Sequence, residues 1–453
     1  MKIVIAGAGK VGSEIIRLLN NEGHDICVID SDSETISFLT DEIDVKCYQG
    51  DATSYEVLQE AGASEADLFV AATQQDETNM ICGISARRLG TKHVIARIRD
   101  PKYLHETEFL RDAFGLDVIV NPELECAREI SRIIRYPAAA RVDAFTKGRI
   151  EIAEHRVRAG GRLEGLKLKN LQKEFGAKVL VCLVERGKEA IAPNGEFELR
   201  TDDILSITGT SNELLKFFKN AGAYKKALKN VMIIGGGRTG VYLSELLAEN
   251  ALNVTIIDRS RERCELLCQV LPDASIIYGD ATKSNVLYEE GIKKADAFVA
   301  LTGDDGNNIV TSLFASSIGK EKIVTKVNHE PFTGILSSSG LDCVVSPKQI
   351  VAQQIARYVR AMSDSKGSSM EALYRLAEGK AEAIEFHVEE GARCINTPLK
   401  ELKLRKGVLF ASVTRGKTGI IPDGNTSLLP GDYAVVVAPA GMLFKIDDIV
   451  EGR

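Results

Sequence analysis

Two short glycine-rich stretches of the chain have the residue types and the spacing to hold phosphate groups. Each follows a β-rich apolar run and precedes a helix-patterned segment, and the glycines are Gly7, Gly9 and Gly12 in one copy and Gly235, Gly237 and Gly240 in the other. In G-x-G-x-x-G, the first glycine permits a tight turn, the second lets phosphate approach the backbone, and the third lets the helix pack on its strand. The helix start then directs N–H groups and the positive end of its dipole at the phosphates. The pattern predicts a bound nucleotide in each copy; the competing interpretation is a tight turn that binds nothing.

An acidic residue follows each glycine motif at the same distance. Asp30 and Asp258 each close a Val/Ile-rich run, 23 positions after the first glycine of their copy. A carboxylate at this place binds the diol of a ribose and repels a 2′-phosphate. We therefore expect NAD-like or adenosine nucleotides in preference to NADP.

Other polar residues recur where further predicted strands end. Asp51 and Asp280 follow a glycine in two Gly-Asp-Ala-Thr stretches, and they either contact the base or ribose or cap the next helix. Arg97 and Lys326 end the fifth predicted strand of each copy, where they either reach a terminal phosphate or form a salt bridge.

The remaining candidates lie in loops at the same edge. Thr73 begins a loop that ends the fourth predicted strand. Asp76 and its counterpart Asp305 are expected to cap the helices that follow, and the alternative is contact with the ligand. Arg238, in the second glycine motif, either adds a charge-assisted phosphate contact, where Lys10 supplies a point charge in the first motif, or is a solvated surface side chain.

Catalytic equipment is not visible beside these motifs. The six histidines share no pattern between the copies, and the sequence offers no acid–base pair for a nicotinamide ring. A dehydrogenase needs such a group to move the proton that accompanies hydride, so no catalytic residue is predicted and the sites are expected to sense rather than transform their ligand. No metal site is predicted either: Cys264 and Cys268 lie one helical turn apart without two further ligands, and we expect them to pack in a core.

The glycine motifs must be positioned by two similar large segments. Over residues 1–136 and again over 230–362, apolar runs without period-two alternation are separated by helix-patterned sequence. Such runs predict a parallel sheet covered on both faces, and right-handed crossovers make it a doubly wound, Rossmann-like α/β domain. The helices predicted at 123–135 and 348–362 carry apolar stripes; they either join lobes between subunits or pack on their own sheets.

Each large segment is followed by a smaller one of different texture. Residues 141–218 read as short strands broken by turns, with one helix near 168–175, and residues 371–453 repeat this small α+β pattern. A core of this size is near the lower limit of self-support, so we expect it to share an interface. Residues 219–229 form the predicted connector before the second large segment, and 363–369 the predicted linker after it.

Composition bounds the class of protein. The chain has 453 residues, 44% of them apolar, a net charge of -7 and nine scattered cysteines. The charge argues against a general nucleic-acid surface, and the cysteines are expected to be reduced thiols. No cleavable signal is seen, and the apolar stretches are shorter than the roughly 18 residues of a membrane span, so we expect a soluble, cytoplasmic protein.

The motifs together resemble a known family. The first large segment, with the strand-rich lobe that follows it, resembles the regulator-of-potassium-conductance (RCK) domain; the residues that carry the likeness are Gly7-x-Gly9-x-x-Gly12, Asp30, Gly50-Asp-Ala-Thr53, Asp67 and Thr73-x-x-Asp76-x-x-Asn79. Two such domains in tandem resemble the TrkA family, the peripheral regulatory subunits of Trk-type potassium uptake systems. The second copy departs from the first where Gly303-Asp-Asp-Gly306 replaces Gln74-Gln-Asp-Glu77.

The resemblance implies NAD(H) or ATP/ADP as regulatory ligands. It also implies a homotetrameric ring on the cytoplasmic face of the cell membrane, with an integral-membrane potassium-conducting subunit of the Trk type as partner. Carried over residue by residue, the binding positions are Gly7, Gly9, Gly12, Asp30, Asp51, Thr73 and Arg97 in the first site, and Gly235, Gly237, Arg238, Gly240, Asp258, Asp280 and Lys326 in the second.

Three functions are compatible with this sequence. The first is a non-enzymatic, nucleotide-sensing subunit that gates a Trk-type channel or transporter when ligands rearrange an RCK ring. The second is a soluble NAD-dependent oxidoreductase built on the same folds. The third is a regulator of a potassium efflux system, which would use the same domains with another membrane partner.

Overall fold

The computed structural model describes residues 1–104, 107–139, 141–145, 149–223, 228–320, 322–328, 336, 341, 343–363, 370–443 and 445–451. The predicted linker, from 364 onward, and residues 224–227 of the predicted connector lie outside the described residues. The contacts divide the chain into two compact units. Unit 1 comprises residues 1–130, 230–319 and 324–356, and unit 2 comprises 131–229, 320–323 and 357–453.

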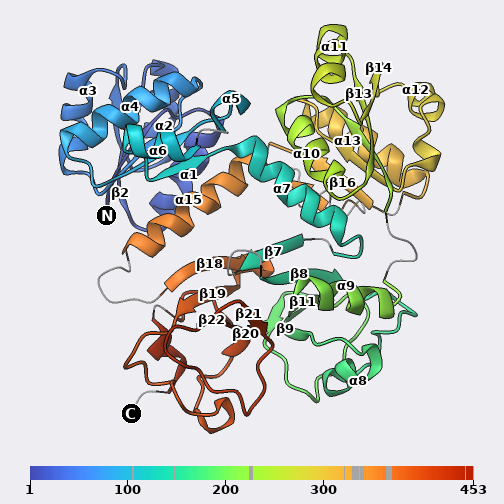
Figure 1. Cartoon of the computed structure of the whole chain (residues 1–453). Helices are drawn as coiled ribbons and strands as arrows, with labels where there is room; N and C mark the ends of the chain where they lie inside the picture. Colours follow the sequence, from blue (N-terminus) through green and yellow to red (C-terminus); the bar gives the residue numbers. More distant parts are fainter. Residues whose placement is uncertain are drawn as a thin grey trace. The chain divides into compact units, whose positions relative to one another are not determined.

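The first large segment is a six-stranded parallel sheet with the order β3-β2-β1-β4-β5-β6 (Figure 1). Its strands are β1 (Lys2–Ala6), β2 (Asp25–Asp30), β3 (Lys46–Gln49), β4 (Leu68–Ala71), β5 (His93–Arg97) and β6 (Val118–Val120). Its helices are α1 (Lys10–Asn21), α2 (Ser33–Glu42), α3 (Tyr55–Glu60), α4 (Asp76–Leu89), α5 (Pro101–Leu104), α6 (Thr107–Phe114) and α7 (Pro122–Arg135). We call this sheet with its helices the first lobe.

The second large segment repeats this order as β14-β13-β12-β15-β16-β17, and we call it the second lobe. Its strands are β12 (Asn230–Ile234), β13 (Asn253–Asp258), β14 (Ser275–Tyr278), β15 (Ala297–Ala300), β16 (Lys322–Lys326) and β17 (Cys343–Val345). Its helices are α10 (Arg238–Ala248), α11 (Arg261–Val270), α12 (Ser284–Glu289), α13 (Asp305–Ser317) and α15 (Pro347–Ser363). The strands β1 and β4 are parallel neighbours at the sheet centre, but the chain after β1 continues to β2 on one side and the chain after β4 continues to β5 on the other. The same holds for β12 and β15, and this reversal of strand order places a ligand crevice at the carboxyl ends of the central strands.

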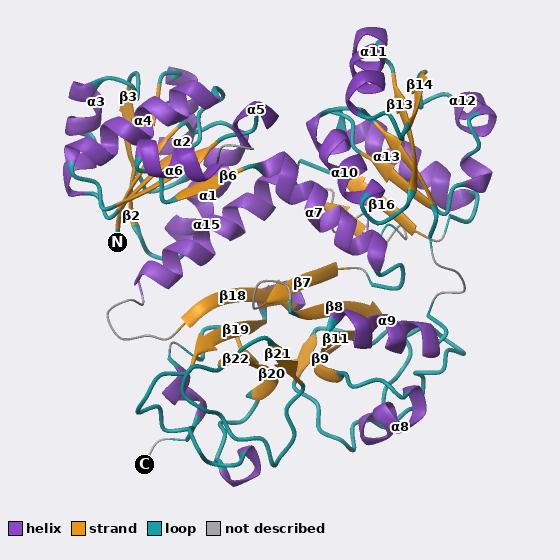
Figure 2. Cartoon of the chain, viewed as in Figure 1, coloured by secondary structure: helices purple, strands orange, loops and turns teal. Residues whose placement is uncertain are grey.

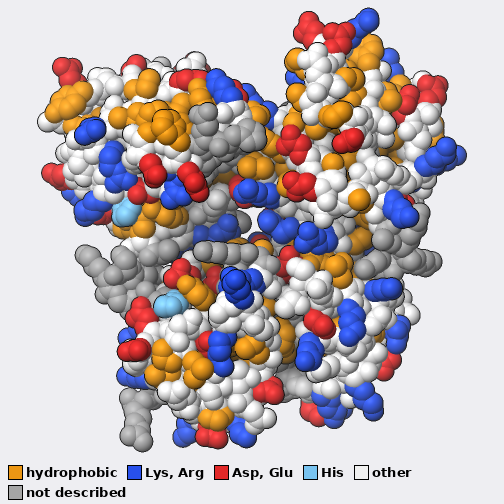
Figure 3. Space-filling model, in the orientation of Figure 1, with side chains coloured by type: hydrophobic (Ala, Val, Ile, Leu, Met, Phe, Trp, Pro, Cys, Tyr) orange, Lys and Arg blue, Asp and Glu red, His pale blue; other side chains and the backbone are white. Residues whose placement is uncertain are grey.

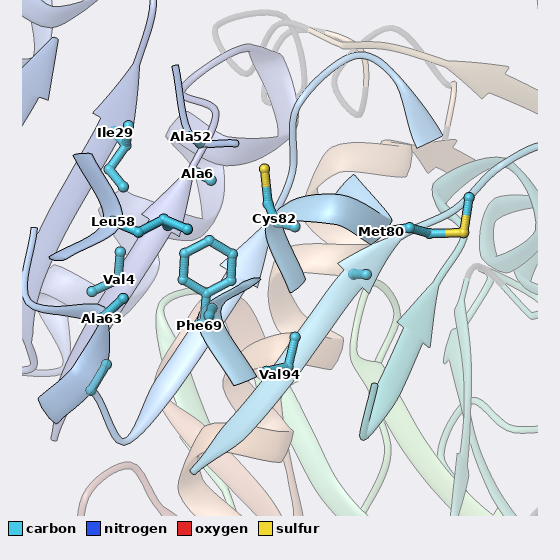
Figure 4. Close-up of a cluster of buried hydrophobic side chains, with 14 of the residues drawn as sticks. Val4, Ala6, Ile29, Ala52, Leu58, Ala63, Phe69, Met80, Cys82 and Val94 are labelled. Carbon is cyan, nitrogen blue, oxygen red and sulfur yellow. The ribbon is translucent and has the colours of Figure 1, made fainter. Parts of the chain in front are cut away.

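The four inner strands of the first lobe, β2, β1, β4 and β5, are apolar over most of their length because both faces of the sheet are buried there, whereas the edge strand β3 has no buried residue. All four residues of β4 are buried, and the Phe69 ring lies among Leu58, Cys82 and Val94 (Figure 4). Helices cover the sheet on both sides in Figure 2. This burial holds the carboxyl ends of the strands in place, and the loops that leave them carry the candidate site.

Unit 2 contains two antiparallel sheets with the same topology. The first has the order β10-β9-β11-β8-β7 and the second β21-β20-β22-β19-β18, read from equivalent edges. The first uses β7 (Arg141–Phe145), β8 (Ile150–Arg156), β9 (Leu180–Arg186), β10 (Glu189–Ile191) and β11 (Ile204–Gly209), with helices α8 (Leu171–Phe175) and α9 (Ser211–Asn220). The second uses β18 (Met370–Leu376), β19 (Ala381–His387), β20 (Leu409–Arg415), β21 (Thr418–Ile420) and β22 (Tyr433–Pro439). The predicted fold class, two Rossmann-like sheets each followed by a small α+β lobe, is confirmed.

The two antiparallel sheets share a hydrophobic cluster, as their small size led us to expect. Phe145 and Ile152 of the first pack in one cluster with Ala383 and Val435 of the second. The ring centroids of Phe145 and Tyr374 lie 4.2 Å apart, and the Tyr374 hydroxyl donates to the Ala144 carbonyl at 2.7 Å. Each small lobe therefore completes the core of the other.

Two helices differ from the prediction. Helix α9 (Ser211–Asn220) was not predicted, although Leu214, Phe217 and Phe218 are its buried residues at helical spacing. The sequence pattern predicts one helix over 102–109, whereas the structure has two helices there, α5 and α6, and the residues between them lie outside the described ranges.

The described surface mixes charges of both signs. Lys and Arg side chains are interspersed with Asp and Glu side chains on the face shown in Figure 3. Among the described residues, no helix is long and apolar enough to cross a membrane.

Candidate functional site

The first and third glycines of each motif are required by the protein itself. Gly7 has φ +93°, and a Cβ there would lie 2.7 Å from the Thr73 nitrogen. A Cβ at Gly12 would lie 1.9 Å from the Gly7 oxygen. In the second motif, Gly235 has φ +99° and a Cβ at Gly240 would lie 2.6 Å from the Gly235 oxygen. These four glycines are explained by the turn and by helix–strand packing alone.

The middle glycines are not explained in this way. Gly9 and Gly237 have φ of -63° and -70°, which any residue adopts, and a Cβ at either would meet no protein atom within 4 Å. Each is the N-cap of its helix, α1 or α10, without a side-chain capping bond. The protein thus leaves open space in front of two helix starts, where N–H groups point outward and the dipole favours an anion. A phosphate group fits this cradle.

Asp30 and Asp258 tie each glycine loop to the end of the neighbouring strand. Asp30 Oδ2 accepts from the Ala8 nitrogen at 2.6 Å, and Asp258 Oδ2 accepts from the Gly236 nitrogen at 2.8 Å. The second oxygen of each accepts from the nitrogen two residues ahead. Because a carboxylate oxygen has two lone pairs, acceptor capacity remains for a ribose diol.

Asp51 and Asp280 hold the turns after β3 and β14. Asp51 Oδ1 accepts from the nitrogen and hydroxyl of Thr53 at 2.9 and 2.8 Å, and Asp280 does the same with Thr282 at 3.1 and 2.7 Å. These hydrogen bonds lower the pKa of both carboxyls. Asp51 and Asp280 therefore do not cap helices, because the N-caps of the helices that follow are Ser54 and Lys283. Each aspartate instead holds a turn to the threonine two residues ahead.

An asparagine that sequence reasoning left without a role holds the loop after the fourth strand. Asn79, fully buried, accepts from the Thr73 nitrogen and hydroxyl at 2.8 and 2.6 Å and donates to the Arg97 carbonyl at 2.8 Å. Asn308 makes the same bonds to Thr302 and Lys326 at 2.9, 2.7 and 3.0 Å. One amide therefore joins the ends of two strands in each lobe. The sequence did contain a sign of this role, because an asparagine recurs six residues after the threonine in both lobes.

Replacing Asn79 by Ala is expected to destabilise the protein by about 2 kcal/mol, because buried backbone donors and acceptors lose their partner. Thermal unfolding should shift down by roughly 4–8 °C. Thr78→Ala, one residue earlier on the half-buried flank of α4, is the control and should stay within about 0.5 kcal/mol. Equal shifts for the two variants would contradict the role assigned to the amide.

Asp76 and Asp305 do not cap their helices, contrary to the prediction. Each is the first residue of its helix rather than the residue before it. Asp76 Oδ2 accepts from the nitrogens of Arg99 and Asp100, at 2.9 and 2.8 Å, and Asp305 Oδ2 accepts from the Asn328 nitrogen at 2.9 Å. They fix the chain after the fifth strand, while Asp304 caps α13.

Arg97 is a buried cation at the end of β5, and Lys326 is a half-buried cation at the end of β16. Arg97 is 8% exposed and donates from Nη2 to the Thr73 carbonyl, and Lys326 donates from Nζ to the Leu301 carbonyl at 3.1 Å. Burial lowers the pKa of Arg97 to about 10 and also lowers that of Lys326. The charges of Glu123 and Asp76 act on Arg97, and those of Asp305 and Glu123 act on Lys326, but the pKa of each cation remains lowered. Both positions therefore favour a further anion, such as a negatively charged ligand.

The second site is a cavity of about 1090 Å³. Six of its seven predicted residues line it, and the seventh, Gly240, lies beneath the loop. The six are Gly235, Gly237, Arg238, Asp258, Asp280 and Lys326. Such a volume lies just above the roughly 300–1,000 Å³ typical of small-molecule sites. In the first lobe, contacts bring Gly7, Asp30, Thr73 and Arg97 to one edge, and Asp51 stays in its own turn.

The two lobes of unit 1 meet beside this cavity. The Tyr242 hydroxyl, on α10, donates to the Arg99 carbonyl at 2.9 Å, and Glu123, on α7 of the first lobe, lines the second-lobe cavity. In the other direction, Lys348 on α15 pairs with Glu14 of α1 at 2.9 Å. The two helices thus reach the other lobe of the same chain, an arrangement that neither sequence interpretation described.

One cysteine of the pair Cys264 and Cys268 is buried as predicted, and the other is not. Cys264 is buried and donates to the carbonyl of Asp258 at 3.6 Å, whereas Cys268 is exposed, contrary to the expected core role. Within the described ranges, no group of three or more His, Cys, Asp or Glu side chains could hold a metal ion.

The chain is similar to known proteins over nearly its whole length. The TrkA-N domain family matches residues 3–122 and 231–347, and the TrkA-C domain family matches 152–222 and 383–449. A Trk system potassium uptake protein TrkA homolog of Archaeoglobus fulgidus is 31% identical over 452 residues, covering 99% of this chain and 100% of the relative. Trk system potassium uptake protein TrkA of Haemophilus influenzae is 31% identical over 444 residues, with 96% and 95% covered.

Solved structures share the fold. The GsuK RCK domain aligns with a TM-score of 0.64 at 20% identity, covering 97% of this chain and 92% of that one. A GsuK channel bound to NAD aligns with a TM-score of 0.64 at 22% identity, covering 97% and 76%, and GsuK bound to ADP with 0.51 at 19%, covering 80% and 69%.

Proposed function

Because the chain belongs to the TrkA family, we propose that it is a nucleotide-sensing regulatory subunit of a Trk-type potassium uptake system. Residues 1–136 and 230–362 would be its sensing lobes, and 141–218 and 371–453 the smaller lobes that follow them. It would act on the cytoplasmic face of the membrane, as a homotetrameric ring, on an integral-membrane potassium-conducting subunit.

One observation carries the ligand assignment. Gly9 and Gly237 stand where the backbone does not need glycine and where the protein leaves open space before a helix start. A phosphate group explains both features, and the buried Arg97 and the half-buried Lys326 supply positive charge at the same edge. The ligands that fit are NAD(H) and ATP or ADP, because Asp30 and Asp258 offer acceptors to a ribose.

The proposed mechanism is linkage between ligand and shape. A nucleotide in the second cavity would lie against Glu123 of the other lobe, so its affinity depends on how the lobes meet. A tenfold preference for one arrangement corresponds to about 1.4 kcal/mol per site, and several sites in one ring add to a decisive bias on the membrane partner.

The test is potassium flux in vesicles that hold a Trk-type membrane subunit, with and without this chain. We expect flux to change on addition of NADH, NAD, ATP or ADP only when the chain is present. Flux that is indifferent to every nucleotide would refute the regulator. Sustained loss of NADH absorbance with a carbonyl substrate would favour the oxidoreductase instead.

Asp30→Ala is expected to weaken nucleotide binding at the first site by roughly tenfold, about 1.4 kcal/mol, because it removes the ribose acceptor and releases the Ala8 nitrogen. Titration calorimetry with NADH and ADP measures this change. Asp25→Ala, at the opposite end of β2, is the control and should leave affinity unchanged. An unaltered affinity in Asp30→Ala would remove the ribose assignment.

A further inference from the structure

The second cavity carries two arginines that the first lobe lacks. After β13 the chain reads Asp258-Arg-Ser-Arg-Glu-Arg263, whereas after β2 it reads Asp30-Ser-Asp-Ser-Glu-Thr35. Arg259 and Arg263 therefore stand where the first lobe has serine and threonine. Both arginines line the cavity.

The same arginines change the charge of the part of the cavity beside Asp258, which we call the ribose end because Asp258 is the residue assigned to the ribose. Arg263 Nη1 lies 3.3 Å from Asp258 Oδ2, which also accepts from Gly236, and Asp258 Oδ1 accepts from Ser260. Asp258 is only 5% exposed, whereas the Arg263 side chain is 53% exposed. The carboxylate is thus neutralised in its own pocket, and the guanidinium keeps donors on the cavity side.

Arg259 lies at the same end of the cavity. Arg259 and Asp280 both line the cavity, and the charge of Arg259 adds to the hydrogen bonds with Thr282 that lower the pKa of Asp280. In the first lobe the corresponding segment adds a second carboxylate, Asp32, which caps α2. The ribose end of the first lobe therefore carries Asp30 and Asp32, whereas that of the second lobe carries Arg259 and Arg263 beside Asp258 and Asp280.

From this difference we propose that the second cavity takes an adenine nucleotide whose ribose carries a phosphate, whereas the first takes one with a free diol. The residues just after the second strand of a Rossmann-like sheet face the adenosine ribose, and arginine there accommodates a ribose phosphate. Guanidinium groups bind phosphate through paired, charge-assisted hydrogen bonds. The inference rests on the proposed function and corrects, for the second site, the expectation that Asp258 excludes such ligands.

The experiment compares AMP, adenosine 2′,5′-bisphosphate and adenosine 3′,5′-bisphosphate, which differ only in the ribose phosphate. Calorimetry uses the full chain with Gly9→Asp, which blocks the first site. We expect one bisphosphate to bind at least tenfold more tightly than AMP. A preference for the 2′ isomer identifies an NADP-like ligand, and one for the 3′ isomer a coenzyme A-like ligand.

The double substitution Arg259→Ser with Arg263→Thr installs the residues of the first lobe and should abolish the preference while AMP still binds. Arg261→Ser is the matched control, since Arg261 is 80% exposed, pairs with Glu265 and does not line the cavity. Equal affinity for AMP and both bisphosphates in the parent chain would overturn the inference, as would a double variant that loses AMP and bisphosphate equally, because the arginines would then stack on adenine. If neither AMP nor NADH binds any site of the unsubstituted chain, the proposed function itself fails.

Discussion

Replacing Gly9 by Asp is expected to reduce nucleotide affinity at the first site by at least roughly 100-fold, about 2.7 kcal/mol, without unfolding the protein. The new Cβ meets no protein atom within 4 Å and the backbone at Gly9 is one that any residue adopts, so the folded chain accommodates the change. The carboxylate, however, fills the phosphate cradle and caps the helix start with its own negative charge. Calorimetry with NADH or ADP, beside a thermal unfolding curve, measures both effects. Gly237→Asp should act in the same way on the second site.

Gly12→Ala is the contrasting variant, because its Cβ would lie 1.9 Å from the Gly7 oxygen. We expect it to lose roughly 1–3 kcal/mol of stability through overpacking of the loop. The pair separates ligand contact from backbone packing within one motif. Two results would contradict a phosphate site at this helix start. One is a melting temperature lowered as much by Gly9→Asp as by Gly12→Ala, and the other is a nucleotide affinity of Gly9→Asp equal to that of the parent chain.

The sheets could be predicted from sequence because strands buried on both faces of a sheet are continuous apolar runs, which are visible in the local sequence. The four inner strands of the first lobe are mainly apolar runs without alternation. Helix α9 was missed although Leu214, Phe217 and Phe218 have helical spacing, because they follow a segment of short strands and turns. The repeat supplied further evidence, since each half constrained the interpretation of the other.

The site was predictable only where function depends on local geometry. The glycine motifs could be recognised because a positive φ and close packing exclude other residues. The role of Asn79 could not, because its partners lie 6 and 18 positions away and meet only in the folded sheet. The capping role predicted for Asp76 was wrong for a related reason. Helix α4 begins at Asp76 itself rather than one residue later, and the carboxylate accepts a hydrogen bond from the Arg99 nitrogen, just after β5.

Asp203→Asn in the first small lobe is expected to cost about 3 kcal/mol, since it breaks an ion pair with a buried carboxylate. Asp203 is 1% exposed, and Arg186 donates to its two oxygens from Nε at 2.8 Å and from Nη2 at 2.7 Å. The second small lobe repeats the pair as Arg415 and Asp432, at 2.9 and 2.8 Å. A device present in both copies, far in sequence from the glycine motifs, indicates a structural clamp between β9 and the turn before β11.

This pair also predicts an acid limit to stability. Burial acts to raise the pKa of Asp203, but the hydrogen bonds and charge of Arg186 outweigh it, so the pKa lies below its ordinary value. A folded pKa below the unfolded value of about 3.9 gives stability that is present above that pH and is lost as pH falls through the folded pKa. The free energy of unfolding of the parent chain should therefore decline below about pH 4, and Asp203→Asn should flatten that decline. Asp202→Asn is the control, because Asp202 is exposed and its φ of 67° suits asparagine.

Denaturant titrations at pH 7 and across the acid range measure the free energy of unfolding of the parent and of both variants. The same acid decline in Asp203→Asn as in the parent would show that the carboxylate does not supply this stability.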